Sequence, residues 1–251
     1  RIDACILTHH HADAIDGLDD LRAWTYKAAV EQTIPIYCTA TTYAYIAAAF
    51  AYMTSKAAAS GGGAVPSFEW HIMPDNEDWE VCGVTITPFP LHHGVYFTTP
   101  PKPLLCLGFL IDSSVLYISD ASYIPEEQWA RLGSKLALPS PSGDCRPPSS
   151  RRSLPRLQAV IIDAGGALRL SASHFGLPQA VATARRLGAH RTYLTDLGHG
   201  VSHECWLAAC RAISRGAHSL EAPAAAAAVH RTAPAWQERT EGAQQPPLED
   251  V

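Results

Sequence analysis

The stretch "ILTHHHADAIDGLDDLR", Ile6 to Arg22, places three histidines and an aspartate within five positions, directly after an apolar run. The residues from Ile2 to Leu7 alternate weakly and are rich in isoleucine, leucine and cysteine, which predicts a buried strand ending at this cluster. In an extended segment, side chains two residues apart point to the same side, so His9 and His11 can reach one ion. Asp13 adds a carboxylate at the start of the helix that follows.

This mixture of ring nitrogens and a carboxylate is typical of zinc, manganese or iron sites, because calcium and magnesium prefer oxygen ligands only. A single histidine is more often a half-exposed surface residue than a ligand, and it is the joint pattern that indicates a metal site. His10 points away from its two neighbours if the segment is extended. Its use as a replacement ligand stays an alternative.

Working outward, the first half of the chain alternates strand and helix patterns and then changes to strands alone. We expect a helix over residues 13–30, a strand "IPIYC" over 34–38, and an alanine-rich helix over 41–53 that stops at the glycines 61–63. These glycines lack the lysine and the strand-to-helix context of a phosphate loop, so we interpret them as a turn. From Phe68 to Asp120, short β-type runs predict a meander of antiparallel strands.

The second half returns to alternating patterns after a segment of different composition. Residues 134–156 are dominated by serine, proline and arginine, which predicts a flexible insertion. A strand over 157–164, a helix over 177–189, a strand over 190–195 and a helix over 203–213 follow. Residues 214–251 turn to alanine, proline, glutamine and glutamate, which is typical of a disordered tail. The pattern predicts an α/β fold in which two packed sheets carry helices on their outer faces.

Composition excludes several kinds of protein. With 251 residues, 47% of them hydrophobic, and a formal net charge of −5, the chain has a sizeable core and no broad basic patch for nucleic acid. No stretch has the length of a membrane span, and no signal-peptide pattern opens the chain. The cysteines form no CxxC pair, and several lie in apolar runs, which favours reduced thiols and a cytoplasmic location. They are Cys5, Cys38, Cys82, Cys106, Cys145, Cys205 and Cys210.

Several motifs together resemble a known family, the metallo-beta-lactamase superfamily. They are "THHHAD" with "GLDDLR", "PLHHG", "YISDASYIPEE", "SHFGLPQA" and "LTDLGHGVSHE", and they occur in the order and approximate spacing of that family. They are most similar to its phosphodiesterase branch, which includes the phosphoribosyl cyclic phosphodiesterase of phosphonate breakdown and, more distantly, the tRNA 3′-end processing endonuclease. The resemblance covers about residues 1–213, which we expect to form one hydrolase domain. It implies a four-layer αβ/βα sandwich. We expect the first strands to be missing here, because the family begins with a glycine-rich strand that precedes the point where this sequence starts.

The resemblance also implies a ligand set for two divalent metal ions, zinc or manganese. His9, His11 and His93 would hold the first ion. Asp13, Asp120 and His199 would hold the second, with Asp120 bridging both. The family motif reads HxHxDH, and Ala14 stands in place of its last histidine. We expect the second site to keep its ion with the remaining ligands and water, and the alternative is a centre with a single metal.

Other polar residues near these motifs have competing interpretations. His92 would be the ligand instead of its neighbour only if the alignment were shifted by one position. His203 either supports the site or caps its helix, and Asp163 either orients a histidine or simply ends its strand. Asp19, Asp20 and Arg22 are interpreted as a solvated helix face with local ion pairs.

The activity implied by the resemblance is hydrolysis of a small or cyclic phosphodiester by a metal-bound hydroxide. His174 matches the family position of the general acid, a role that suits an imidazole, although a capping or surface role is the alternative. Two other functions stay open: a thiolester or lactone hydrolase on the same scaffold, and a degenerate relative without catalytic activity. The natural substrate and the oligomeric state do not follow from the sequence.

Overall fold

The structure, a computed structural model, describes residues 1–59, 61, 65–139, 154–166 and 171–215. Its first sheet has the order β1-β2-β3 with all strands parallel. In β2, alternate residues are fully buried because one face of the strand packs on helices, and the side chains involved are those of Ile34, Ile36 and Cys38. The bounds are β1 (Cys5–Ile6), β2 (Ile34–Cys38), β3 (Phe68–Ile72), α1 (Ala12–Ile15), α2 (Gly17–Thr25), η1 (Tyr26–Ala28), α3 (Ala40–Ala49), α4 (Ala51–Thr54) and η2 (Lys56–Ala58).

The second sheet has six strands in the order β4-β5-β6-β7-β8-β9. Strands β4 to β7 pair antiparallel, whereas β7, β8 and β9 are parallel to one another. The bounds are β4 (Trp79–Val81), β5 (Val84–Tyr96), β6 (Lys102–Ile111), β7 (Val115–Ile118), β8 (Ala159–Asp163), β9 (Arg191–Thr195), α5 (Glu126–Lys135), α6 (Leu177–Leu187) and α7 (His203–Ser214).

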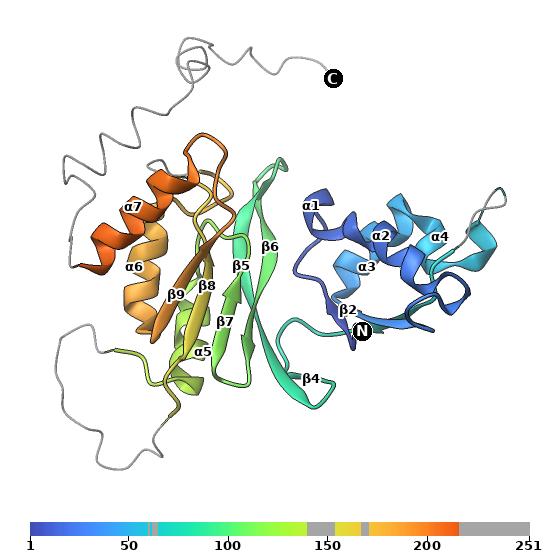
Figure 1. Cartoon of the computed structure of the whole chain (residues 1–251), viewed down its shortest axis with the longest axis horizontal. Helices are drawn as coiled ribbons and strands as arrows, with labels where there is room; N and C mark the ends of the chain where they lie inside the picture. Colours follow the sequence, from blue (N-terminus) through green and yellow to red (C-terminus); the bar gives the residue numbers. More distant parts are fainter. Residues whose placement is uncertain (60, 62–64, 140–153, 167–170, 216–251) are drawn as a thin grey trace, which may run out of the picture.

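The two sheets lie next to each other in the middle of the molecule, with α1 to α4 on one outer side and α5 to α7 on the other (Figure 1). A hydrophobic cluster between the sheets includes Trp79, Leu107 and Phe109 from the second sheet, packed against Ile6 and Tyr37 from the first. The largest described cluster lies between the second sheet and helices α5 and α6. The predicted α/β sandwich of two sheets with outer helices is confirmed.

One strand assignment from the sequence was wrong. The run "FEWHI" was predicted to open the antiparallel meander, but it forms β3 and pairs in parallel with β2, Ile34 opposite Phe68. The reason is the connection: α3 and α4 lie between β2 and β3, and a crossover of this length brings the next strand back in parallel. The antiparallel meander therefore begins at β4.

The helices also differ from the prediction in detail. The helix expected over residues 13–30 ends at Thr25, and Lys27 and Ala28 take positive φ angles that end the regular structure. The alanine-rich helix is interrupted at Phe50. Helix α5 was not predicted, although "EEQWARL" places Trp129 and Leu132 on one face, where both are buried in the core.

Asp19 and Arg22 form the expected local ion pair at 2.9 Å, and Asp19 also accepts a hydrogen bond of 2.8 Å from the Tyr52 hydroxyl. Asp19 therefore links α2 to α4 as well as to its own helix.

Parts of the predicted insertion and tail fall outside the described residues. Ser134 and Lys135 end α5, and Leu136 after them is buried. Residues 140–153 and 216–251 lie outside the described part of the chain, as do glycines 62 and 63.

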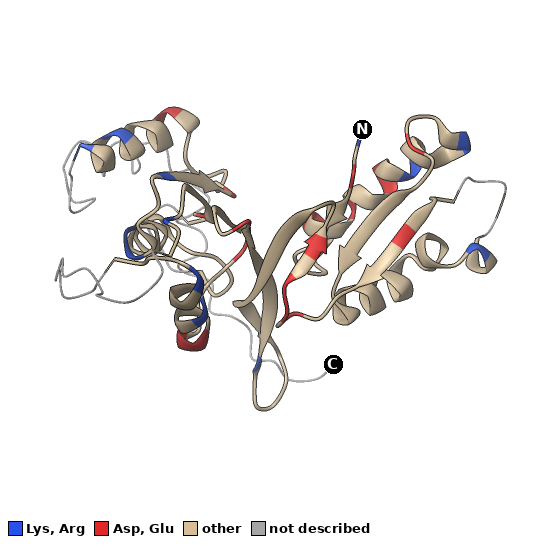
Figure 2. Ribbon diagram, turned by 90° about the horizontal axis from the view of Figure 1, so that it is seen from below, with Lys and Arg blue, Asp and Glu red and all other residues tan. Residues whose placement is uncertain are grey.

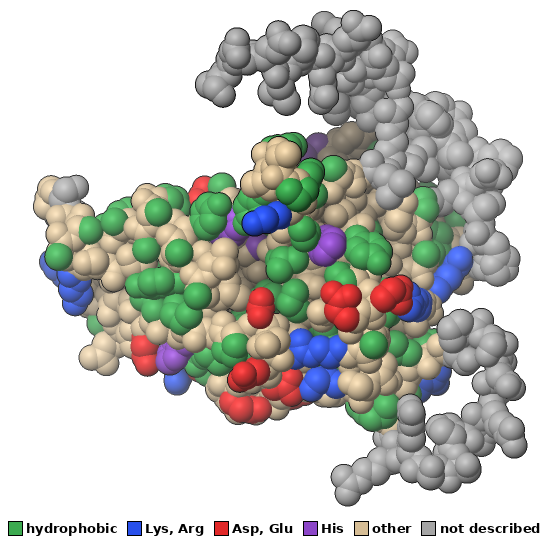
Figure 3. All heavy atoms as spheres, turned by 180° about the vertical axis from the view of Figure 1, so that it is seen from behind, with side chains coloured by type: hydrophobic (Ala, Val, Ile, Leu, Met, Phe, Trp, Pro, Cys, Tyr) green, Lys and Arg blue, Asp and Glu red, His purple; other side chains and the backbone are tan. Residues whose placement is uncertain are grey.

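None of the described helices has both the length and the hydrophobicity that crossing a bilayer requires. Acidic and basic residues occur in both halves of the molecule (Figure 2), and on the reverse face, where most of them lie in the lower part of the view, the two signs are found close together (Figure 3). The absence of a nucleic-acid partner stays a prediction.

Candidate metal centre

The histidine-rich segment continues from β1 as extended backbone, because His11 has φ −67° and ψ 153° at the N-terminus of α1. Its side chains therefore alternate as predicted. His9 is buried and lies with His11, whereas His10 points to the other side and stacks on Tyr45 with ring centroids 3.7 Å apart. A ligand role for His10 does not fit this orientation.

Three imidazole rings meet at the junction of the two sheets. The ring centroids of His9, His11 and His93 lie 4.7 to 4.8 Å from one another. His93 comes from β5 and follows His92, whose ring instead lies against Tyr123 at 5.4 Å. Of the two neighbouring histidines, His93 is therefore the one at the cluster.

Hydrogen bonds decide which ring nitrogens face the centre. The Ser173 carbonyl lies 2.7 Å from His93 Nδ1, so this nitrogen donates and Nε2 carries the lone pair, 2.9 Å from His11 Nδ1. His9 Nδ1 lies 3.0 Å from the Thr8 hydroxyl. The nitrogens available to an ion are thus His9 Nε2, His11 Nδ1 and His93 Nε2.

This donor set fits a divalent metal ion. His9 Nε2 is buried and has no hydrogen-bond partner in the structure, which is costly for a ring nitrogen unless a ligand occupies the position beside it. Burial lowers the pKa of His9 to about 4, with the neighbouring His93 and His11 also lowering it against the opposing effect of Asp120. Burial likewise lowers the pKa of His11. Both rings are therefore neutral, as metal ligation requires.

Asp120 lies just after β7 and adjoins the imidazole cluster. It is only 8% exposed, and its carboxylate shares two groups of potential ligands whose ligand atoms all lie within 4.8 Å of one another. One group joins Asp120 to His93 and His174, and the other joins it to His9 and Cys106. Burial raises the pKa of the Cys106 thiol to about 12, so this group is a neutral thiol. Asp120 is the residue shared by the two groups, as a bridging ligand would be.

Asp163 connects the segments on either side of the centre. It ends β8, is fully buried, and accepts hydrogen bonds from the backbone of Ala121 (2.9 Å), Gly165 (2.8 Å) and Phe175 (3.3 Å). His174 Nδ1 lies 3.1 Å from the same carboxylate, and this bond raises the pKa of His174 although burial opposes it. Asp163 therefore orients His174, and by holding Ala121 it also fixes the backbone next to Asp120.

Asp196, directly after β9, was missed by the sequence analysis. Its Oδ2 lies 2.9 Å from His174 Nδ1, and its backbone is held at a φ of 57°. Burial raises the pKa of Asp196, the positive charge of His174 opposes this rise, and the negative charges of Asp163, Asp120 and Asp13 add to it. Its place in the sequence could have revealed it, because Asp196 directly follows the predicted strand "HRTYLT", just as the other candidate site residues directly follow predicted strands.

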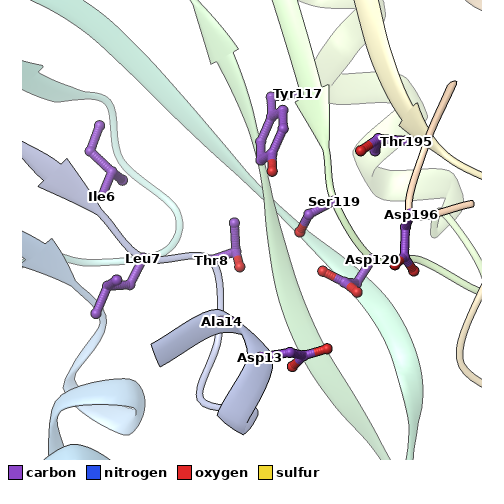
Figure 4. Close-up of a pocket in the computed structure, with 10 residues that line it drawn as sticks. All are labelled: Ile6, Leu7, Thr8, Asp13, Ala14, Tyr117, Ser119, Asp120, Thr195 and Asp196. Carbon is purple, nitrogen blue, oxygen red and sulfur yellow. The ribbon is translucent and has the colours of Figure 1, made fainter. Parts of the chain in front are cut away.

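A cavity of about 390 Å³ lies beside these groups. Asp13, Asp120 and Asp196 reach it from three different segments, and Ala14 lies on the same wall as Asp13 (Figure 4). The remaining lining residues are Ile6, Leu7, Thr8, Tyr117, Ser119 and Thr195. The cavity is thus the space toward which a histidine at position 14 would have extended.

Two of the predicted ligands lie apart from the histidine cluster. Asp13 is exposed at the cavity and belongs to none of the described ligand groups. His199 is exposed in the loop before α7 and is likewise outside these groups. His203 is exposed at the start of α7, where Ser202 and not His203 caps the helix. The ligand roles of Asp13 and His199 stay predictions.

Comparison with known proteins assigns the family. A family model described as a beta-lactamase superfamily domain matches residues 1–196. The chain belongs to the beta-lactamase superfamily. Members of this superfamily are typically hydrolytic enzymes that bind divalent metals. The match includes every residue of the centre up to Asp196, whereas His199 lies beyond its end.

Solved structures with this metallo-beta-lactamase fold resemble the chain. A diphosphatase of the PhnP family is 24% identical with a TM-score of 0.59, and the match covers 81% of this chain and 63% of that one. YhfI from Bacillus subtilis is 21% identical (TM-score 0.52, 80% and 68% covered), and an isothiocyanate hydrolase from Delia radicum gut bacteria is 15% identical (TM-score 0.50, 85% and 70% covered). At these identities the similarity shows the fold alone. A search of curated proteins gave no match.

Proposed function

We propose that this chain is a metal-dependent phosphodiesterase that hydrolyses a small or cyclic phosphodiester. The observation that carries the proposal is the placement of His174 beside the cluster of His9, His11 and His93, with Asp120 between them. The cluster would bind the metal, and His174 would serve the leaving group. Both parts are needed for the hydrolysis of an unactivated diester.

His9, His11 and His93 would hold the first ion, and Asp120 would face both ions. Asp13 and His199 are the proposed partners of Asp120 at the second ion. Bound divalent ions supply Lewis acidity and make water nucleophilic near neutral pH. Zinc and manganese are the proposed metals, since the donors are nitrogen and carboxylate oxygen.

The proposed role of His174 is to supply a proton. As the oxygen of water attacks phosphorus, the bond from phosphorus to the leaving oxygen breaks, and this oxygen needs a proton to leave as an alcohol. Asp163 accepts the hydrogen bond from His174 Nδ1, which leaves Nε2 as the nitrogen that delivers the proton. Asp163 is a positioning residue, because it acts through His174.

The same fold also serves reactions at carbon, as the isothiocyanate hydrolase shows by its name. A thiolester has a good leaving group that requires little help from an acid. The buried carboxylate that orients His174 favours a substrate with a poor leaving group, such as an alkyl phosphodiester. The free thiols of Cys5, Cys38 and Cys106 support the proposed reducing, cytoplasmic environment.

The proposal is tested by measuring hydrolysis of bis(p-nitrophenyl) phosphate, with a thiolester and a lactone in parallel. We expect metal-dependent turnover of the diester, abolished in Asp120→Asn and retained in Asp20→Asn, a matched change at an exposed carboxylate of α2. Equal circular dichroism spectra of the variants would show that the fold is intact. Turnover of the thiolester or lactone but not the diester, or full activity in Asp120→Asn, would overturn the proposal.

A further inference from the structure

The second metal position has lost a nitrogen, and the structure indicates what takes its place. We propose that Asp196 is a ligand of the second ion, which makes this position rich in carboxylates and selective for a hard divalent cation such as Mn²⁺, while the three-histidine position holds zinc. The inference rests on the proposed function, because it concerns the same centre. It names a ligand that the HxHxDH pattern does not contain.

The lining of the cavity is the first observation. Asp196 faces the same space as Asp13, Ala14 and Asp120, although it comes from the end of β9 and they come from α1 and β7 (Figure 4). Three carboxylates that face one cavity repel one another unless a cation lies between them. The cavity volume of about 390 Å³ leaves room for an ion with several water molecules.

An independent observation places an ion-binding position next to this cavity, in the histidine cluster that does not itself line the cavity. His9 is 1% exposed and its Nε2 has no partner, and a ligand atom of His9 lies within 4.8 Å of a carboxylate oxygen of Asp120. Asp120 therefore joins the histidine cluster to the carboxylates of the cavity. The two positions share this residue but differ in their other donors.

Other side chains are less suited to replace the missing nitrogen. His10 stacks on Tyr45, away from the centre. Cys106 is fully buried on β6 and is not part of the cavity wall that contains Ala14. His174 Nδ1 is already engaged by Asp163. Asp196 Oδ2 lies 2.9 Å from His174 Nδ1, but the proton of that nitrogen is donated to Asp163, so the carboxylate of Asp196 keeps lone pairs for an ion.

The donor set determines the choice of metal. With Asp13, Asp120 and Asp196, the second position has three carboxylates and at most one histidine, His199. Carboxylate and water ligands suit manganese and magnesium, whereas the imidazoles of the first position suit zinc. The chain would therefore bind two different metals, one at each position.

The test uses the full chain, stripped of metal, loaded with one equivalent of zinc and titrated with MnCl₂ while free Mn²⁺ is followed by electron paramagnetic resonance. We expect about one manganese ion to bind per zinc-loaded chain. Asp196→Asn should weaken manganese binding by about tenfold or more, since even residues behind a ligand cost 10–100-fold in affinity. Asp20→Asn should bind manganese like the unchanged protein. Asparagine tolerates a positive φ, so Asp196→Asn is expected to fold, and thermal unfolding verifies this.

A second variant tests the same inference from the opposite direction. Ala14→His restores the missing nitrogen, so we expect the chain to take up a second zinc ion in place of manganese. Unchanged manganese affinity in Asp196→Asn, or no manganese binding to the zinc-loaded chain, would overturn the inference. The proposed function fails separately: Asp196-dependent manganese binding without diester hydrolysis would contradict the activity and leave the ligand assignment standing.

Discussion

His93 illustrates how one hydrogen bond sets the chemistry of a side chain. The Ser173 carbonyl takes the proton of Nδ1, and Nε2 is thereby turned toward the centre as a lone-pair donor. Asp163 likewise accepts the Nδ1 proton of His174, which leaves Nε2 as the other nitrogen, the one proposed to deliver a proton. The sequence predicted that His93 and His174 matter, and it offered Asp163 as a residue that orients a histidine. It did not reveal Ser173 as the partner of His93, because the two lie 80 residues apart in the chain.

The role of His174 leads to a prediction about leaving groups. His174→Ala should lower kcat for an alkyl phosphodiester by about 10²–10⁴-fold, the usual contribution of a general acid. For bis(p-nitrophenyl) phosphate the loss should be much smaller, because p-nitrophenolate leaves without a proton. Steady-state kinetics with both substrates measures the difference, and His190→Ala, at an exposed histidine, is the control. An equal loss for both substrates would contradict the role of proton donor.

Among the helices and strands, the bounds of a strand could be predicted from its own residues, whereas its pairing partner could not. The strand Ile34–Cys38 was predicted with its bounds, since alternating burial leaves a clear trace in "IPIYC". The partner of Phe68–Ile72 was predicted wrongly, because pairing depends on the crossover through α3 and α4 and not on the strand's own residues. Asp196 was missed for a related reason: β9 pairs with β8, and only this pairing brings its end next to Asp163 and His174.

The end of α6 gives a prediction about stability. Gly188 caps this helix with a φ of 63°, and a methyl group there would collide with the ring of Pro139. A residue other than glycine costs roughly 1–2 kcal/mol in this conformation before the collision is counted. Gly188→Ala should therefore lower the free energy of unfolding by at least about 1 kcal/mol, measured by urea denaturation.

Gly17→Ala is the matched control for this change. Gly17 begins α2 with open space around it, so alanine should leave the free energy of unfolding unchanged or raise it by up to about 1 kcal/mol. Similar effects of the two substitutions would show that the left-handed cap of α6 carries no strain.

At the scale of the whole molecule, the centre joins the two sheets. His9 and His11 follow β1 of the first sheet, whereas His93 and Asp120 belong to the second. The Leu107 amide also donates to the Thr8 carbonyl across this junction at 3.0 Å. The order of the motifs predicted from the sequence that these histidines belong to one site. The position of Asp196 and the exposure of His199 could not be predicted, because both depend on how the second sheet packs.

A metal that bridges the sheets should stabilise the folded chain. An ion bound only to the folded state contributes about 4 kcal/mol when its free concentration is a thousand times its Kd. For a chain of this size we expect removal by a chelator to lower Tm by roughly 10 °C. Differential scanning calorimetry before and after chelation measures the change, and adding zinc back should restore it. The same Tm in both states would exclude a bridging ion.

We propose that this chain builds a two-metal centre despite Ala14. The most direct measurement is the metal content of the purified protein, by elemental analysis, for the unchanged chain and for Asp120→Asn. We expect about two divalent ions per chain, counted over zinc and manganese together, and a clear loss in the variant. One ion or none in the unchanged chain, or the same content in both proteins, would contradict it.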